Sequence, residues 1–109
     1  MLIRIAVQGK VMFRMVTSIR ELLFGKKGEI HSVTDTPYDF SQEKEIRSAL
    51  DAEHPEVKLV KGIDHIFAIN GQGFRKAGEV KGEKSGIKME IYTNRNGIGI
   101  YSACGFFYF

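Results

Sequence analysis

The stretch that decides the fold is GIDHIFAINGQGFRKAGEVKGEKSGIKMEIYTNRNGIGIYS, residues 62–102. Short apolar or alternating runs recur along it and just before it, and glycine or asparagine punctuates each gap. We expect five strands, at 57–60, 64–69, 74–80, 87–93 and 98–102. Between the last two, Asn94-Arg95-Asn96-Gly97 predicts a hairpin, because Asn-Gly tolerates the positive φ values of a tight turn. Regular short strands favour an all-β sandwich or barrel over a βαβ protein.

The first part of the chain is less regular. Residues 1–16 alternate apolar and polar side chains on both sides of Gln8-Gly9-Lys10, which predicts a hairpin. Ser18 can cap a short helical turn through Glu21, and Gly25 would end that turn.

The middle of the chain contains one strand signal and one helix signal. Residues 28–33 predict a strand that ends within 34–37, where Pro37 fixes φ and removes a ladder donor. Apolar residues at helical spacing within 46–50 predict one short helix, which Pro55 would close. We therefore expect an all-β chain with at most one or two short helices.

Length and charge limit the classes of function. With 109 residues, the chain can form one small domain but not two. Its 16 Lys and Arg against 13 Asp and Glu give a charge of +3, and the basic residues are scattered along the chain. We expect no nucleic-acid partner, because such a protein would show a basic stripe interleaved with stacking aromatics. We also expect no membrane partner, because no segment has the length of a membrane span. The single Cys104 cannot form an intramolecular disulfide, which fits a cytoplasmic protein.

Residue patterns that bind metals or cofactors are sparse. His31, His54 and His65 are spaced too widely for a metal pair on one helix or strand, and no cysteine accompanies them. Gly71-Gln72-Gly73 is a glycine-rich turn without a following helix that could direct backbone N–H groups at a phosphate. We expect neither a metal nor a cofactor.

The most informative short segment is Gly62-Ile63-Asp64-His65-Ile66-Phe67, at the start of an expected strand. Adjacent strand residues point to opposite faces, so Asp64 and His65 cannot line the same pocket. An aspartate among Ile and Phe is costly to bury unless it accepts good hydrogen bonds, and sugar hydroxyls are suitable donors. The structural alternative is that Asp64 caps a turn while His65 packs in the core.

Three motifs occur in a fixed order along residues 28–103. They are Gly28-Glu29-Ile30 followed by Thr36-Pro37-Tyr38-Asp39-Phe40, then residues 62–67, then residues 85–93 followed by Gly97 and Tyr101. Together they resemble the aldose 1-epimerase (galactose mutarotase) family, which carries a Gly-x-Asp-His-x-Phe segment like residues 62–67. These isomerases interconvert the α and β anomers of hexoses such as galactose and glucose.

The resemblance implies a fold, a partner and a site. It implies part of a galactose mutarotase-like β-sandwich, also called a supersandwich, with a small-molecule hexose as partner. Asp64 matches the family's sugar-binding aspartate and is the expected substrate-binding residue. In the family a His acts as acid and a Glu acts as base, and a second His contacts the sugar. All three positions fall outside the region resembled here. We therefore assign no catalytic residue in this chain.

The resemblance is limited to part of the chain. We expect three segments: residues 1–27 without a clear counterpart, residues 28–103 resembling the C-terminal region of the family, and an unmatched aromatic tail at 104–109. Asn96 stands where the family usually has Pro, and Gly99 stands where many members have a Gln that approaches the sugar. These departures predict that hexose binding is weak or lost.

Three functions remain open from the sequence. The leading expectation is a truncated, inactive C-terminal piece of an aldose 1-epimerase, so whether the chain is an enzyme stays open. The first alternative is a non-catalytic carbohydrate-binding module that keeps Asp64; the second is a small β-rich interaction protein that docks through its aromatic end. A piece of a larger sandwich would leave strand edges uncovered, so we also expect self-association through those edges.

Overall fold

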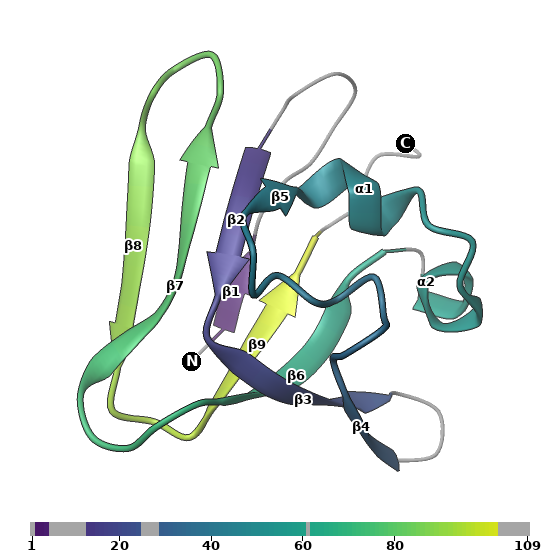
Figure 1. Ribbon diagram of the computed structural model, residues 1–109, viewed down its shortest axis with the longest axis horizontal. Coiled ribbons are helices and arrows are strands. Elements are labelled where there is room, and N and C mark those ends of the chain that lie inside the picture. The colour runs from purple at the N-terminus through teal and green to yellow at the C-terminus, as the bar shows by residue number, and fades with distance from the viewer. Residues whose placement is uncertain (1, 5–12, 25–28, 61, 103–109) are drawn as a thin grey trace.

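A computed structural model of the chain describes residues 2–4, 13–24, 29–60 and 62–102 (Figure 1). Its elements in chain order are β1 (Leu2–Arg4), β2 (Phe13–Thr17), β3 (Ile19–Phe24), β4 (Glu29–Ser32), β5 (Lys44–Glu45), α1 (Ile46–Leu50), α2 (Pro55–Val60), β6 (Asp64–Ile69), β7 (Arg75–Gly82), β8 (Lys88–Thr93) and β9 (Gly97–Tyr101). Strands dominate and the two helices are short, so the expected all-β class is confirmed.

The strands form two sheets. Sheet A has the order β1-β9-β6-β3-β4, and sheet B has the order β5-β2-β7-β8. All neighbouring strands are antiparallel except β1 and β9, which are parallel. The strands expected at 64–69, 74–80, 87–93 and 98–102 are confirmed as β6 to β9, and the strand expected at 28–33 is confirmed as β4.

The hairpin expected at Asn94–Gly97 is wrong, because β8 lies in sheet B and β9 lies in sheet A. The Ile69 N–H donates to the Asn96 carbonyl at 2.9 Å, so the chain after β8 pairs with β6 instead of returning along β8. The Arg75 guanidinium donates to the carbonyls of Thr93 and Arg95 at 3.3 and 2.8 Å. These bonds hold the chain where it crosses from one sheet to the other.

Two predictions for the first part of the chain are also wrong. The strands of the hairpin expected in residues 1–16 lie in different sheets: β1 pairs with β9, and β2 pairs with β5 and β7; the turn at Gln8-Gly9-Lys10 lies outside the described residues. In place of a helical turn at Ser18–Glu21, the chain forms β3 between β4 and β6. Burial of Leu22 in the core outweighs a helix of one or two turns. The expected stop at Gly25 lies outside the described residues.

The predicted helix within 46–50 is confirmed as α1, but Pro55 does not close it. Instead Pro55 begins α2, so the expected strand at 57–60 is helical. Proline suits the first position of a helix, where its missing N–H would have no partner anyway. The His54 ring supports this start, because its Nδ1 accepts the Glu56 N–H at 3.2 Å.

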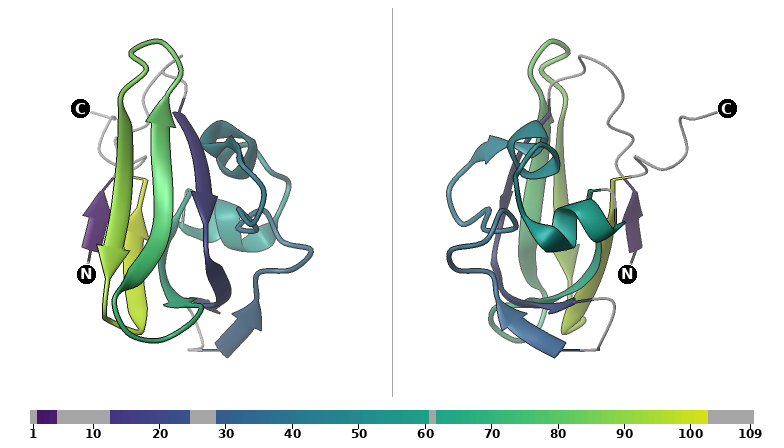
Figure 2. Two further views of the ribbon diagram at one scale, coloured as in Figure 1. Left: turned by 60° about the vertical axis from the view of Figure 1, so that its left-hand side comes forward. Right: turned by 90° about the vertical axis from the view of Figure 1, so that its right-hand side faces the viewer.

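The core lies on the inner face of sheet A, which is covered by two different layers. Ile98 and Ile100 face Met15, Val80 and Ile91 of sheet B. The other part of the inner face is covered by residues 33–60, which include both helices (Figure 2). Burying each large aliphatic or aromatic side chain contributes about 1.5–3 kcal/mol. The fully buried side chains of this core include Tyr38, Leu22, Ile46 and Ile69.

Candidate functional site

Asp64 is the first residue of β6, and its side chain is exposed. The chain enters β6 through Gly62, whose φ of 127° suits glycine and few other residues. Burial along β6 alternates, so Asp64 and Ile66 are exposed while His65 and Phe67 are buried. The expected separation of Asp64 and His65 onto opposite faces is confirmed. Asp64 therefore does not carry the burial cost that the sequence suggested, and within the described chain no group hydrogen-bonds its carboxylate.

The outer face of sheet A, which carries Asp64, also contains an open groove. The groove has a volume of about 330 Å³, within the range typical of small-molecule sites. It is lined by Glu21, Leu22, Leu23, Ile30, Ile66, Phe67, Ala68, Asn96 and Gly97. Asp64 lies two residues before Ile66 on the same face of β6, so it stands about 7 Å along the strand from the groove.

Strand register brings the two sugar-related positions of the sequence together. Asp64 lies opposite Tyr101, and Gly99 lies opposite Ile66. Asp64 and Gly99 are therefore diagonal neighbours on one sheet face, at a separation of about 7–8 Å. The resemblance implied that both positions approach a sugar, and β6 and β9 hold them side by side. Glycine at position 99 contributes no side chain to this face.

Behind Asp64, a buried polar cluster fixes the start of β6. The backbone N–H of Asp64 donates to His65 Nδ1 at 3.1 Å, so the ring proton must be on Nε2. His65 Nε2 then donates to Glu56 Oε2 at 2.7 Å, and both side chains are buried. Tyr38 packs on the His65 ring with centroids 4.8 Å apart. Burial raises the pKa of the Tyr38 phenol, and the nearby Glu56 raises it further.

The outer face of sheet B has a different character, because its charges are already paired. Lys76 Nζ lies 2.7 Å from Glu79 and 3.0 Å from Glu90. Arg14 Nε donates to Glu43 at 3.0 Å, and this hydrogen bond lowers the pKa of Glu43 below its ordinary value. A solvated ladder of paired charges offers little to a neutral ligand, so the outer face of sheet A is the better candidate.

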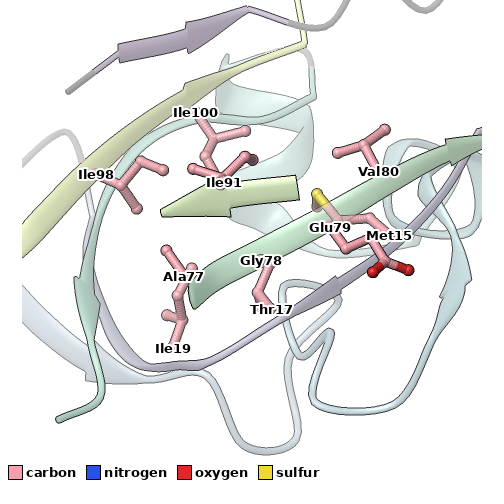
Figure 3. Close-up of a pocket in the computed structure, with 10 residues that line it drawn as sticks. All are labelled: Met15, Thr17, Ile19, Ala77, Gly78, Glu79, Val80, Ile91, Ile98 and Ile100. Atoms are coloured by element: carbon pink, nitrogen blue, oxygen red, sulfur yellow. The ribbon is translucent and has the colours of Figure 1, made fainter. Parts of the chain in front are cut away.

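The space between the sheets is too small to be a substrate site. Ten residues from both sheets surround it, including Met15, Ala77, Ile91 and Ile98 (Figure 3). The cavity volume is about 10 Å³, which is near the lower limit for a single water molecule. It is a packing defect of the sandwich core.

The other histidines of the sequence do not gather at the groove. His31 on β4 lies 3.2 Å from Glu29, and His54 caps α2. Within the described residues, no three His, Cys, Asp or Glu side chains are placed to hold a metal ion. In the same part of the chain, no helix is long and apolar enough to cross a membrane.

Sequence reasoning missed the groove itself. Glu21 fell in a segment expected to be helical, Leu23 was not singled out, and Ile30 was noted only as part of a motif and of an expected strand. One signal was present, because residues 65–69 are apolar or buried on both faces of the strand instead of alternating with polar residues. An antiparallel strand with an apolar outer face marks a surface that binds or packs against something.

Comparison with known proteins identifies relatives of this fold. The family model described as aldose 1-epimerase matches residues 15–106. The GalM/aldose epimerase homologue from C. elegans is similar with a TM-score of 0.70 and 26% identity, over 85% of this chain and 29% of that one. The galactose 1-epimerase from Lactobacillus acidophilus NCFM has a similar fold, with a TM-score of 0.57 and 24% identity, over 63% of this chain and 22% of that one. The chain thus spans less than a third of the length of either protein. Comparison with curated proteins gave no match.

Proposed function

The chain belongs to the aldose 1-epimerase family, and on that premise we propose that the outer face of sheet A binds a hexose such as galactose or glucose, with Asp64 accepting hydrogen bonds from its hydroxyls. The observation that carries the proposal is the position of Asp64: an exposed carboxylate on the same face as an apolar groove of about 330 Å³.

The chemistry of this face suits a sugar ring. A pyranose presents hydroxyls at its rim and C–H groups on its faces. The Asp64 carboxylate can accept hydrogen bonds from two or more hydroxyls, and such charge-assisted hydrogen bonds are about twice as strong as neutral ones. The exposed side chain of Ile66 provides the apolar neighbour against which ring C–H groups can pack.

We further propose that these 109 residues bind a hexose without converting its anomers. Mutarotation needs a base at the anomeric hydroxyl and an acid at the ring oxygen, each contributing about 10²- to 10⁴-fold. The resemblance assigns those roles to a Glu and a His of the family, and neither residue has a matching position in this chain. Asp64 can orient a hydroxyl but cannot carry both proton transfers.

Binding is tested by titrating the ¹⁵N-labelled chain with galactose and glucose while following backbone amide shifts. We expect saturable shifts on β6 and β9, and at least about a tenfold loss of affinity in Asp64→Asn, which removes the charge and keeps the shape. Asp51→Asn is the matched control, because Asp51 is an exposed aspartate at the end of α1. Equal binding by the two variants, or no binding by the unmodified chain, would overturn the role of Asp64.

A gain-of-function variant strengthens the test. Gly99→Gln restores the side chain that many family members carry, and φ at Gly99 is not positive, so the backbone can accept it. We expect tighter galactose binding, since the new side-chain amide would add one hydrogen-bonding group beside Asp64. Polarimetry of α-glucose mutarotation addresses turnover separately: a rate above the spontaneous one would contradict the proposal that the chain only binds.

A further inference from the structure

Strand β8 forms an open edge of sheet B. It is the last strand in the order β5-β2-β7-β8, and β7 is its neighbour on one side. In Figure 1, no described element lies beyond β8 on its other side. An uncovered edge presents backbone N–H and C=O groups that can pair with another strand.

The direction of these groups follows from one hydrogen bond. Lys88 pairs with Lys81, which places Ile87 opposite Gly82, and the Gly82 N–H donates to the Ile87 carbonyl at 3.0 Å. Backbone groups alternate along a strand, so Ile87, Met89 and Ile91 direct theirs toward β7. Lys88 and Glu90 therefore direct their N–H and C=O groups outward from the edge.

The side chains of β8 are divided between its two faces. Lys88 and Glu90 lie on the charged outer face. Met89 lies opposite the buried Val80 on the core side, yet it is 42% exposed, and the preceding Ile87 is 73% exposed. The core side of the sheet thus reaches its edge with apolar side chains that sheet A does not cover.

We propose that this edge pairs with β8 of a second copy of the chain, antiparallel and with the two-fold axis at Met89. This register places Lys88 of each copy opposite Glu90 of the other, which forms two pairs of opposite charge. It also places the two Met89 side chains directly opposite each other on the core side. The outward backbone groups of Lys88 and Glu90 meet in hydrogen-bonded pairs. The same register therefore pairs the opposite charges, hydrogen-bonds the backbone groups and brings the apolar Met89 side chains into contact.

Neighbouring registers are less favourable. An axis at Glu90 would set the two Glu90 side chains opposite each other, and an axis at Lys88 would do the same with the two lysines. Shifts that pair an outward residue with an inward one leave the backbone groups unmatched. Lys88 and Glu90 also contact Glu79 and Lys76 within one copy, at 3.9 and 3.0 Å. These two contacts lie toward β7, and Glu90 also accepts a hydrogen bond from the Tyr92 hydroxyl at 3.2 Å along β8 itself. Lys88 and Glu90 are both exposed.

Sedimentation velocity over a concentration series tests the assembly. We expect a reversible dimer, and a dissociation constant raised at least about tenfold in Lys88→Glu, which replaces two attractive pairs by two repulsive ones. The exchange Lys88→Glu with Glu90→Lys restores opposite charges and should restore the dimer. A protein that is monomeric at all concentrations, or a dimer with the same dissociation constant in the unmodified chain and in both variants, would refute the proposed edge.

Cysteine cross-linking tests the register in a Cys104→Ser background. Residues that face each other in a non-hydrogen-bonded pair have Cα atoms about 4.5 Å apart, within reach of a disulfide. Met89→Cys should therefore form a covalent dimer on mild oxidation. Tyr92→Cys is the matched control, because in this register the two introduced thiols would lie about 20 Å apart along the strands. Cross-linking at position 92 but not at position 89 would overturn the register.

Discussion

Replacing His65 by alanine should strongly destabilise the protein. The change removes the 2.7 Å hydrogen bond from His65 Nε2 to Glu56 and leaves that buried carboxylate without this donor. It also removes a ring that packs on Tyr38. A hydrogen bond to a charged group contributes about 1.5–3 kcal/mol, and truncating a large buried side chain adds a cavity cost, so we expect about 3–5 kcal/mol in total. A domain of this kind is stabilised by only about 5–15 kcal/mol.

Two milder variants separate the two bonds of the ring. His65→Gln can place an amide N–H near the former Nε2 and keep the contact with Glu56. His65→Asn can place an amide oxygen near the former Nδ1 and keep the bond from the Asp64 N–H, which is 3.1 Å long in the structure. Because the bond to Glu56 is the stronger one, the Gln variant should retain more stability. The Asn variant should keep the Asp64 amide resonance closer to its original position.

Urea denaturation measures the free energy of unfolding of all three variants, and ¹⁵N spectra follow the Asp64 amide. A loss of less than about 1 kcal/mol in the alanine variant would contradict the contribution that we assign to the hydrogen bond between His65 and Glu56. The assignment also fails if the Gln and Asn variants behave alike in both measurements. In that case the ring would only fill space, and the two nitrogens would have no separate roles.

Two further predictions concern the core and the response to acid. Leu22→Ala should lower the free energy of unfolding by about 3 kcal/mol, because Leu22 is 1% exposed. Ile66→Ala in the groove should change it by less than about 1 kcal/mol, because Ile66 is 60% exposed. Urea denaturation measures the free energy of unfolding of both variants. The Arg14 hydrogen bond lowers the pKa of Glu43 below its ordinary 4.5, so its contribution to stability is present above that value and is lost as the pH falls through the folded pKa. Glu43→Gln should therefore lose less stability than the unmodified chain between about pH 6 and about pH 3, measured by thermal unfolding.

The sequence predicted strands well where turn residues bound each short apolar run. At β6 to β9, glycine or asparagine turns separate short apolar or alternating runs, and the structure has strands at all four. It failed at residues 57–60, where three apolar residues in a short run fit a strand and a helix equally well. Only the contacts of α2, including the buried Glu56, decide between the two.

Strand pairing was beyond local reasoning for a different reason. Asn94–Gly97 has the residues of a tight hairpin turn, but a turn signal states only that the chain changes direction. Whether the next strand returns along β8 or moves to the other sheet depends on Arg75 and β6, which lie about 20–30 residues earlier in the sequence. The site was predictable to the same extent: the face of Asp64 followed from strand alternation, but its neighbour Gly99 and the groove beside it depend on sheet order.

The two outer faces of the sandwich differ in how far their charges are compensated within the chain. On sheet B, Lys76 contacts Glu79 and Glu90, and Arg14 contacts Glu43, so the charges there are largely compensated within the chain. On sheet A, no hydrogen bond joins the Asp64 carboxylate to another residue in the described part of the chain, and the exposed Ile66 lies two residues along the same strand face. A lone carboxylate contributes little to folding in that position, and exposed isoleucines contribute less than buried ones. A ligand with hydroxyl donors and C–H faces would satisfy both features together, and for this reason we propose a sugar for this face.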